Sequence, residues 1–339
     1  MKNVALIINL GSPDSADIPS VRKYLKEFLM DKYVLDNPAL VRWLLVHGLI
    51  LRFRPKRTTE AYKAIWTDKG SPLLVTSKRV VEKLQSVASV PIYLAMRYGN
   101  PSIRDVLDSI RVDHPDIQLL SIVPLYPHYA MSTTKTVIEK VKDVSLELGF
   151  DVQIKYKEPF YNEPKYINAL ADSIAPYVSA KYEHYLFSYH GLPVRHLVKT
   201  DPTGQHCYSS NDCCNVASSA HLYCYKHQVL TTTALVAEKL NLPSDKFSVS
   251  FQSRLLRDPW ITPFTDSEIV KLAQRGVKSI AVICPAFVSD NLETLEEIAI
   301  EGKETFIEAG GSRLDLIPCM NDNHLWIDTL KHYVESMCL

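Results

Sequence analysis

Eight short runs of β-branched and other apolar residues recur along the chain, and stretches with the period of a helix separate them. In SVRKYLKEFL (20–29) and LVTSKRVVEKLQSV (74–87), the apolar residues fall on one helical face. A repeated order of strand, helix and strand predicts parallel sheets that helices cover on both faces. The predicted strands are residues 3–9, 90–95, 117–123, 151–156, 184–189, 247–251, 279–284 and 313–317.

The eight strands divide into four and four, with a change of unit near residues 150–180. We predict an α/β fold with two similar doubly wound domains that face each other across a cleft. The first domain is expected over residues 1–160 and the second over 161–321, with a cysteine-bearing insert at 203–224. The C-terminal helix (322–339) is then able to pack back on the first domain.

Composition and charge narrow the class of protein. Of the 339 residues, 46% are hydrophobic, which is enough for a large core and excludes disorder. The chain has 38 acidic and 38 basic residues, and this balance argues against nucleic acid as a partner. The apolar run Val4–Leu10 is too short for a signal peptide, and no run reaches the length of a membrane span. A cytoplasmic protein is therefore expected.

The loops that follow the strands carry most of the unusual residues. In open parallel sheets, the ligand crevice lies beyond the carboxyl ends of the strands, so these loops are predicted to converge on one cleft. Neither G-x-G-x-x-G nor G-x-x-x-x-G-K-[ST] occurs, so nucleotide phosphates are not predicted. The loops are LGSP (10–13), RYGNP (97–101), PLYPHYAMSTT (124–134), YHGLP (189–193), FQSR (251–254) and CPAFVSDNLE (284–293).

His190 stands where the strand HYLFSY gives way to a turn that Gly191 and Pro193 force open. An imidazole at a strand end sits on a rigid element and faces the crevice, and its ordinary pKa of about 6.5 suits proton exchange or metal ligation. The alternative is a histidine that caps the sheet with both ring nitrogens satisfied.

Three carboxylates follow the strand SIAVIC. Asp290, Glu293 and Glu297 are three and four residues apart, which places them on one face of an α-helix. Mutual repulsion would raise their proton affinity and favour a nearby cation. Alternatively, Asp290 and Glu293 form a capping box at the start of the helix.

Four of the seven cysteines lie close together, at Cys207, Cys213, Cys214 and Cys224. Their spacing lacks the paired C-x2-C pattern that is usual for zinc. Four thiolates can instead hold an iron–sulfur cluster, with zinc as the alternative.

The segment ALVRWLLVHGLILRFRPKR (39–57) is apolar at first and then basic. It predicts either a buried helix followed by a basic loop or a hydrophobic lip that touches an anionic membrane surface.

Several long motifs resemble one family, the ferrochelatases, over nearly the whole chain. These enzymes are lyases that insert ferrous iron into a porphyrin. The motifs are INLGSP (8–13), YKAIWTDKGSPL (62–73), MRYGNPSI (96–103), PLYPHYAMSTT (124–134), FSYHGLP (187–193), FQSRLLRDPWITPFTD (251–266) and PAFVSDNLETLEEI (285–298).

The resemblance implies two Rossmann-like domains, the chelatase fold, and roles for particular residues. His190 matches the essential active-site histidine and Glu293 the glutamate that faces it, and both would meet the substrate Fe(II). Asp290 and Glu297 match an acidic path for protons or metal. Residues that match the porphyrin pocket are Leu10, Arg97, Tyr98, Tyr126 and Phe287.

Two departures from the family pattern stand out. Asn291 occupies a position where some relatives have histidine, and the G-D-P-Y-x-x-Q element is split between Asp201-Pro202 and Tyr225-x-x-Gln228. The cysteines are thus an insertion, which resembles the internal segment of those bacterial ferrochelatases that hold a [2Fe-2S] cluster. In this family the lip of residues 39–57 implies peripheral contact with the inner face of the membrane.

The implied reaction converts protoporphyrin IX and Fe(II) to protohaem with release of two protons, the terminal step of haem biosynthesis. One alternative is the same reaction with coproporphyrin III as the substrate. The other is a non-catalytic carrier of haem or metal. A related chelatase for cobalt or nickel typically has a second histidine in place of the glutamate, and the intact SDNLETL stretch counts against it. The protein is expected to be a monomer or a homodimer.

Overall fold

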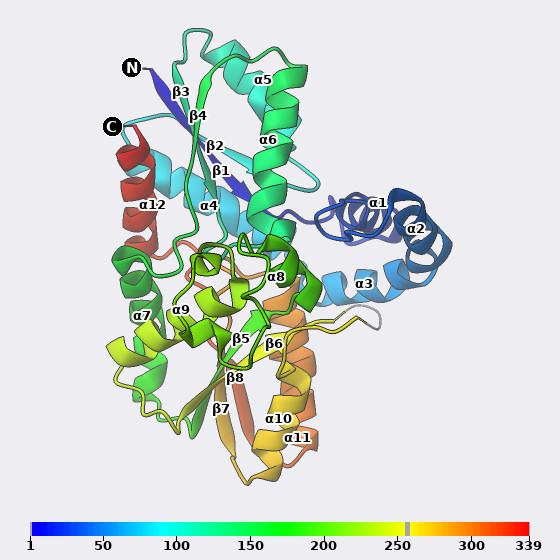
Figure 1. The fold of residues 1–339 in the computed structure, drawn as a ribbon, viewed down its shortest axis with the longest axis vertical. Coiled ribbons are helices and arrows are strands. Elements are labelled where there is room, and N and C mark those ends of the chain that lie inside the picture. Colours follow the sequence, from blue (N-terminus) through cyan, green and yellow to red (C-terminus); the bar gives the residue numbers. More distant parts are fainter. Residues whose placement is uncertain (1, 255–257, 339) are drawn as a thin grey trace. The chain divides into compact units, whose positions relative to one another are not determined.

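The structure is a computed structural model that describes residues 2–254 and 258–338. Leu255, Leu256 and Arg257 of the FQSRLLRDPWITPFTD motif lie outside the described residues, as does Leu339 at the end of the predicted last helix. The chain divides into two compact units (Figure 1). The first comprises the chain up to Tyr126, Met131–Glu158 and the chain from Ile327, and the second comprises Pro127–Ala130 and Pro159–Trp326.

All eight predicted strands form, in two parallel sheets. The first unit holds β1 (Asn3–Asn9), β2 (Ile92–Met96), β3 (Leu119–Pro124) and β4 (Gln153–Tyr156), in the order β2-β1-β3-β4. The second holds β5 (His184–His190), β6 (Phe247–Gln252), β7 (Ser279–Ile283) and β8 (Arg313–Leu316), in the order β6-β5-β7-β8. Strand ends differ from the predicted ones by at most two residues. The predicted α/β class with two four-stranded parallel sheets is confirmed.

Helices connect the strands in both units. In the first part of the chain they are α1 (Ile18–Leu29), α2 (Ala39–Trp43), α3 (Leu51–Ile65), α4 (Pro72–Val87), α5 (Ile103–Asp113) and α6 (Thr136–Glu147). Later follow α7 (Pro164–Ser179), α8 (Val194–Thr200), α9 (Tyr225–Lys239), α10 (Thr265–Gln274), α11 (Lys303–Glu308) and α12 (His324–Met337). Short 3-10 turns at Cys213–Asn215 and Ser219–Leu222 lie in the cysteine insert.

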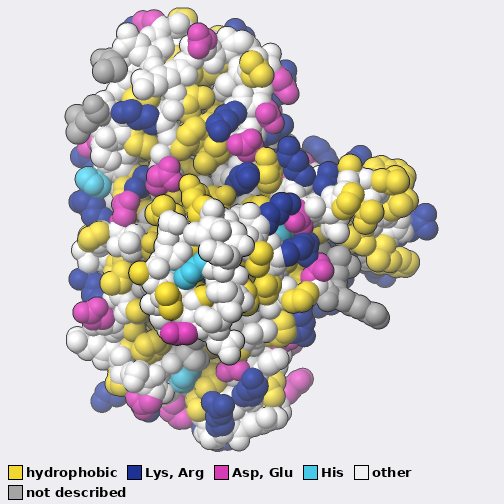
Figure 2. All heavy atoms as spheres, viewed as in Figure 1, with side chains coloured by type: hydrophobic (Ala, Val, Ile, Leu, Met, Phe, Trp, Pro, Cys, Tyr) yellow, Lys and Arg dark blue, Asp and Glu magenta, His cyan; other side chains and the backbone are white. Residues whose placement is uncertain are grey.

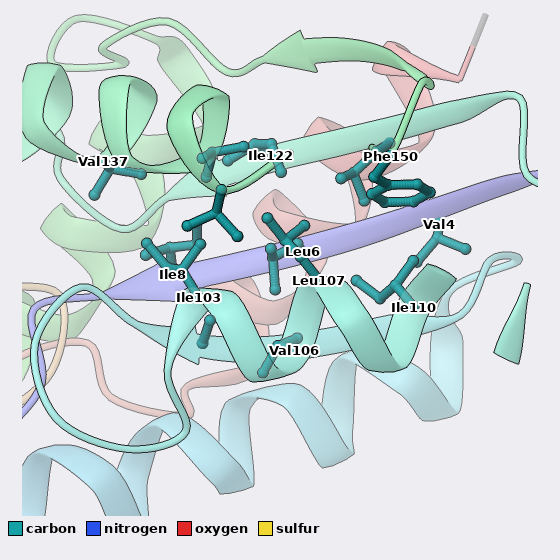
Figure 3. Close-up of a cluster of buried hydrophobic side chains, with 14 of the residues drawn as sticks. Val4, Leu6, Ile8, Ile103, Val106, Leu107, Ile110, Ile122, Val137 and Phe150 are labelled. Atoms are coloured by element: carbon teal, nitrogen blue, oxygen red, sulfur yellow. The ribbon is translucent and has the colours of Figure 1, made fainter. Parts of the chain in front are cut away.

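The core of the first unit follows from the burial of β1 on both faces. Val4 to Ile8 are each at most 1% exposed, as expected for the interior strand of a parallel sheet. Alternate residues of this strand pack against α5 and α6, and Figure 3 shows them together. On the other face, the Asn9 amide donates a hydrogen bond to the Ser77 hydroxyl of α4 at 3.0 Å.

The second unit repeats this arrangement around β5. Leu186 packs with buried side chains of α10 and α11, including Phe306. Ser188, on the same face, lies 2.8 Å from the hydroxyl of Thr265 at the start of α10. Tyr189 points to the opposite face, where its hydroxyl lies 2.8 Å from that of Thr233 in α9. The alternation therefore places His190 at the end of the face that carries Leu186 and Ser188.

Among the described residues, three segments are π-helices, namely η1 (Leu44–Ile50), η2 (Met131–Lys135) and η5 (Glu293–Gly302). A π-helix forms bonds from residue i to i+5, and the apolar period of a short segment does not distinguish it from an α-helix. The expectation of an α-helical face at 290–297 is wrong for this reason, and Asp290 precedes the helix.

Candidate active site

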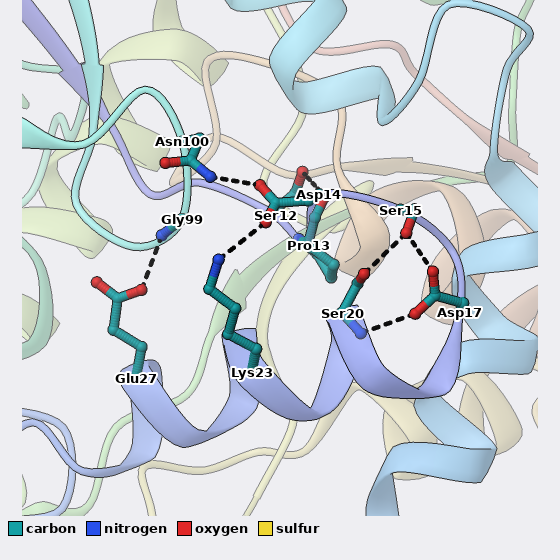
Figure 4. Close-up of polar contacts among 10 residues, drawn as sticks. All are labelled: Ser12, Pro13, Asp14, Ser15, Asp17, Ser20, Lys23, Glu27, Gly99 and Asn100. Carbon is teal, nitrogen blue, oxygen red and sulfur yellow. Dashed lines mark hydrogen bonds and ion pairs between the residues drawn. The ribbon is translucent and has the colours of Figure 1, made fainter. Parts of the chain in front are cut away.

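Two loops that follow strands meet in the first unit. Gly11 has a φ of +104°, and a Cβ built there would lie 1.8 Å from the carbonyl oxygen of Tyr98, so only glycine fits. Figure 4 shows the contacts that join the loops: the Asn100 amide donates to Asp14 at 2.7 Å, and the Gly99 N–H donates to Glu27 at 3.0 Å. The LGSP and RYGNP loops thus form one rigid edge beyond β1 and β2.

Asp31 organises the polar residues beneath this edge. One carboxylate oxygen of this buried residue accepts hydrogen bonds from the guanidinium of Arg97, the hydroxyl of Thr136 and, at 2.8 Å, the phenol of Tyr98. Arg97 also donates from Nε to Thr136 at 2.8 Å and stacks over the ring of Tyr98 at 4.3 Å. Arg97 therefore has a fixed orientation. The sequence offers no signal for Asp31, which lies 66 residues before Arg97.

The structure places the other predicted porphyrin residues of this unit at different depths. Tyr98 is fully buried beneath Arg97, and burial raises the pKa of its phenol well above the usual value. Its predicted contact with a porphyrin would require this side chain to become exposed. Leu10 is partly buried against the core. The Tyr126 hydroxyl is buried and has no hydrogen-bond partner among the described residues.

His190 ends β5, half-buried, and two backbone contacts fix its place. Its Nδ1 lies 2.7 Å from the carbonyl oxygen of Gly191. A carbonyl can only accept, so Nδ1 carries the proton and the neutral ring has its lone pair on Nε2. The phenol of Tyr225 donates to the carbonyl oxygen of His190 at 2.9 Å. The ring of Phe287 stands perpendicular to the imidazole at a centroid distance of 6.5 Å.

Gln252 links the strand that carries His190 to the helix that carries Glu293. It pairs with His190 in the register of β5 and β6, and its amide oxygen accepts from Ser188 at 2.8 Å. Its amide nitrogen lies 3.5 Å from the carbonyl oxygen of Glu293. The sequence patterns assign no role to this residue of the FQSRLLRDPWITPFTD motif. Its position at a strand end, like that of His190, was the available signal.

Glu297 lies in the same π-helix as Glu293, about one turn further along. The Ser253 hydroxyl donates to its carboxylate at 2.9 Å. Both residues line a cavity of about 190 Å³ that Asp266 and Glu301 also border. A row of acidic side chains thus follows the π-helix away from Glu293, with a small cavity beside it.

Asp290 contacts the helix through the Thr294 hydroxyl, which donates to its carboxylate at 3.3 Å, and it also holds the loop after β8. Its carboxylate accepts from the Cys319 N–H at 3.1 Å and from the Asn321 amide at 2.6 Å, so it anchors the loop after β8. The reciprocal cap is made by Asn291 and Thr294, whose side chains each accept from the other's N–H at 3.0 Å. The reciprocal cap thus lies one residue later than the one predicted for Asp290 and Glu293.

The four cysteines of the insert are all buried. The neighbouring Cys214 thiol lowers the pKa of Cys224 to about 6. Burial raises the pKa of Cys207 to about 12. Within residues 2–254 and 258–338, no group of three or more His, Cys, Asp or Glu side chains has the geometry to hold a metal ion. A cluster site is thus not shown.

The segment of residues 39–57 exposes many of its apolar side chains, although Val46, Ile50 and Leu51 are buried. Leu40 is 70% exposed, Trp43 50% and Phe53 73%. Figure 2 shows apolar side chains gathered over α2. The basic residues Arg52 and Arg54 lie on α3. The alternative of a buried helix followed by a basic loop is therefore wrong. In the part of the chain that the structure describes, no helix is both long enough and apolar enough to span a bilayer.

Solved structures with a similar fold define the class. SirB from Bacillus subtilis with Fe3+ aligns with a TM-score of 0.56 at 12% identity, over 99% of this chain and 95% of its own. The sirohydrochlorin chelatase SirB from Bacillus subtilis subspecies spizizenii in complex with cobalt aligns at a TM-score of 0.55 and 10% identity, with the same coverage. At these identities the likeness concerns the fold alone, and the fold is that of a metal chelatase.

The sequence comparisons identify the family. The ferrochelatase family model matches residues 2–338. A ferrochelatase of Pseudomonas fluorescens is 51% identical over 333 residues, which cover 97% of this chain and 96% of the relative. A ferrochelatase of Opitutus terrae is 48% identical over 334 residues, which cover 98% and 96%. The chain belongs to the ferrochelatase family, and the predicted resemblance is confirmed.

Proposed function

We propose that this chain inserts Fe(II) into protoporphyrin IX and yields protohaem and two protons. The observation that carries the proposal is the orientation of His190, whose backbone contacts leave the lone pair of the neutral ring on Nε2. Gln252 joins this strand end to the backbone of Glu293, so a base and a carboxylate belong to one framework. The high identity to relatives named ferrochelatase supports the same reaction.

The chemistry requires groups of these two kinds. A free porphyrin is flat, and two of its four nitrogens carry protons that block the metal. Binding of the large faces can supply roughly 1–5 kcal/mol to bend the ring. Nε2 of His190 then accepts a pyrrole proton, since a neutral imidazole is a good base near pH 7. Glu293 takes the complementary part, as second proton acceptor or as a ligand of the entering iron.

The acidic row provides a route between the reaction and water. Glu297, with Ser253 donating to it, lies beside the cavity of about 190 Å³. Carboxylates held near one another attract protons and cations. Asp290 adds its charge to this row while its oxygens hold the loop after β8. Arg97, Leu10, Tyr126 and Phe287 are proposed to contact the macrocycle, with Tyr98 supporting Arg97.

An anaerobic assay with purified protein tests the function. Protoporphyrin fluorescence is followed after addition of Fe(II), in parallel with coproporphyrin III. We expect loss of protoporphyrin fluorescence at the faster rate, because the exposed apolar segment suits a substrate with fewer carboxylates. Binding of porphyrin without loss of fluorescence would identify a carrier instead, and faster loss with coproporphyrin would change the substrate.

We also propose that the insert holds a [2Fe-2S] cluster on Cys207, Cys213, Cys214 and Cys224. The residue types fit such a cluster, because four buried cysteines lie within one insert and four thiolates are its usual ligands. When bound, such a cluster supplies one-electron redox chemistry. Protein prepared without oxygen should be reddish-brown and lose its visible absorption in Cys213→Ser. A colourless preparation that contains zinc would contradict this proposal.

Finally, we propose that residues 39–57 contact the inner face of the membrane from the cytoplasm. The exposed Leu40, Trp43 and Phe53 would enter the interface, and the cations of α3 would meet anionic head groups. Co-sedimentation with vesicles of anionic phospholipid tests this. Phe53→Ser should reduce binding, whereas Leu146→Ser, at an exposed leucine of α6, should leave it unchanged. Equal binding of both variants would contradict the proposal.

A further inference from the structure

The cysteine insert and the active-site histidine meet at a single residue. The helix α9 begins at Tyr225, and Cys224 is its N-cap. The phenol of Tyr225 donates to the carbonyl oxygen of His190 at 2.9 Å. One peptide bond therefore separates a proposed cluster ligand from the side chain that holds the backbone of the proposed catalytic base.

The surroundings of Tyr225 leave this contact little freedom. The side chain is buried, and the ring of His128 packs edge-on against it at 5.9 Å and against Tyr189 at 5.5 Å. The Thr232 hydroxyl donates to the Tyr161 carbonyl at 2.7 Å, so it must accept from Nε2 of His128, 2.9 Å away. His128 is thereby fixed between α9 and the end of β5. A shift of the first turn of α9 would be passed to His190, since closely packed interiors transmit displacements.

The middle of the insert also contacts the first turn of α9. Nδ1 of His227 lies 2.8 Å from the carbonyl oxygen of Cys214. His206 reaches the carbonyl oxygen of the neighbouring Cys213 at 2.8 Å. Cys214 is therefore attached to the first turn of α9 through its backbone, and Cys213 to the start of the insert. A change in what the sulfurs bind would act directly on this turn.

We infer that Tyr225 is a positioning residue for His190, and that it transmits the state of the cysteine insert, with cluster or without, to the active site. The inference rests on the proposed iron insertion and on the proposed cluster. It gives the insert a function that needs no contact between the cysteines and the substrate. Removal of the cluster should slow turnover and leave porphyrin binding unchanged.

The test measures kcat and the porphyrin KM of wild type, Tyr225→Phe and Tyr166→Phe, before and after removal of the cluster with a chelator. Tyr166 is a matched control, because its buried phenol also donates to a backbone carbonyl, that of Pro285, at 2.9 Å. Iron content and the visible spectrum are recorded on each sample. Hydrogen exchange of the peptide 184–193 provides a readout that does not depend on activity.

In wild type, we expect cluster removal to lower kcat about tenfold with KM within twofold, because small misplacements of a base are costly. Exchange in residues 184–193 should rise in parallel. Tyr225→Phe should begin near the lowered kcat and respond less than about twofold to cluster removal, since the connection is already cut. Tyr166→Phe should keep the full response of wild type.

Three results would overturn the inference. Cluster removal could lower the kcat of Tyr225→Phe as much as that of wild type, or it could leave both the kcat and the exchange of wild type unchanged. The third result is a rise in KM as large as the fall in kcat. Wild-type protein without iron and sulfide would contradict the cluster alone. In that case a lowered kcat in Tyr225→Phe at constant KM still supports the positioning role, and an unchanged kcat overturns it. Wild-type protein that inserts no iron would contradict the proposed function. In that case, a rise in the exchange of residues 184–193 on cluster removal would still support transmission from the insert to His190, and unchanged exchange would contradict it.

Discussion

The two units place different residues at the same point of the same topology. β1 and β5 occupy equivalent interior positions, and each ends in a turn with glycine and proline, INLGSP in one and SYHGLP in the other. Asn9 ends β1 with its amide engaged at both atoms, by Ser77 at 3.0 Å and by the Leu10 N–H at 2.8 Å. His190 ends β5 with its Nδ1 bound to the carbonyl oxygen of its own backbone turn, so the lone pair of the neutral ring is on Nε2. The fold offers this strand-end position twice, and the proposed reaction uses the copy that ends in histidine.

Replacing each of the two strand-end side chains with alanine tests this comparison most directly. His190→Ala should lower kcat by about 10²–10⁴-fold, the usual contribution of a general base, with the thermal midpoint unchanged. Asn9→Ala should instead cost about 1–3 kcal/mol of stability, because it leaves buried polar groups without partners, while turnover per folded molecule is largely kept. Turnover and thermal unfolding measured on both variants check the pair. Near-normal turnover of His190→Ala would refute its assignment.

Replacement of the Glu293 carboxylate should have the next largest effect on kcat. Glu293→Gln keeps the size of the side chain and removes its charge, so kcat should fall by about 10²-fold. The control is Glu304→Gln, at an exposed residue of α11 that lies outside the proposed site. Initial rates with Fe(II) and protoporphyrin compare the two. Equal rates for both variants would remove Glu293 from the mechanism.

Most of the fold follows from the sequence, because parallel strands buried on both faces give continuous apolar runs that are easy to recognise. The strand ends, and so His190, follow from the same pattern. The contact of Asp31 with Arg97 does not, since no local pattern links residues so far apart in the chain. Two pairs, Asp290 with Glu293 and Asn291 with Thr294, both have the spacing of a cap. The sequence does not show which pair forms the cap. In the structure, Asp290 holds the loop after β8.

Stability should separate two glycines of the first unit. Both have positive φ, +104° at Gly11 and +113° at Gly70, but only at Gly11 does a Cβ meet a backbone atom. Gly11→Ala should cost about 2–4 kcal/mol because the loop around Tyr98 must shift, whereas Gly70→Ala should cost about 1 kcal/mol for its backbone conformation alone. Urea unfolding measures both. Equal costs would show that the LGSP and RYGNP loops are not rigidly joined.

The two units should also differ in their response to acid. Burial lowers the pKa of His128 to about 3 and of His184 to about 4, and both residues belong to the second unit. Unfolding lets them take up protons below the unfolded pKa of about 6.5. Their contribution to stability is thus present above pH 6.5 and is lost as the pH falls toward 4, at about 1.4 kcal/mol per pH unit for each histidine at most.

Hydrogen exchange at pH 7 and pH 5, corrected for intrinsic rates, checks this expectation. Protection of β5 and β7 in the second sheet should fall more than that of β1 and β3. His184→Gln should remove part of the difference. An equal fall in both sheets would show that these histidines do not set the acid response.

The π-helix at Glu293–Gly302 makes the chain sensitive to its length at this point. Deletion of one residue there would allow ordinary α-helical bonding and would rotate every later side chain by about 100° around the axis. Glu297 would then turn away from Ser253, and Gly302 would no longer enter α11 in its present orientation. A substitution in this segment changes a single side chain. A deletion of one residue would instead change the direction of every acidic side chain that follows it in the row.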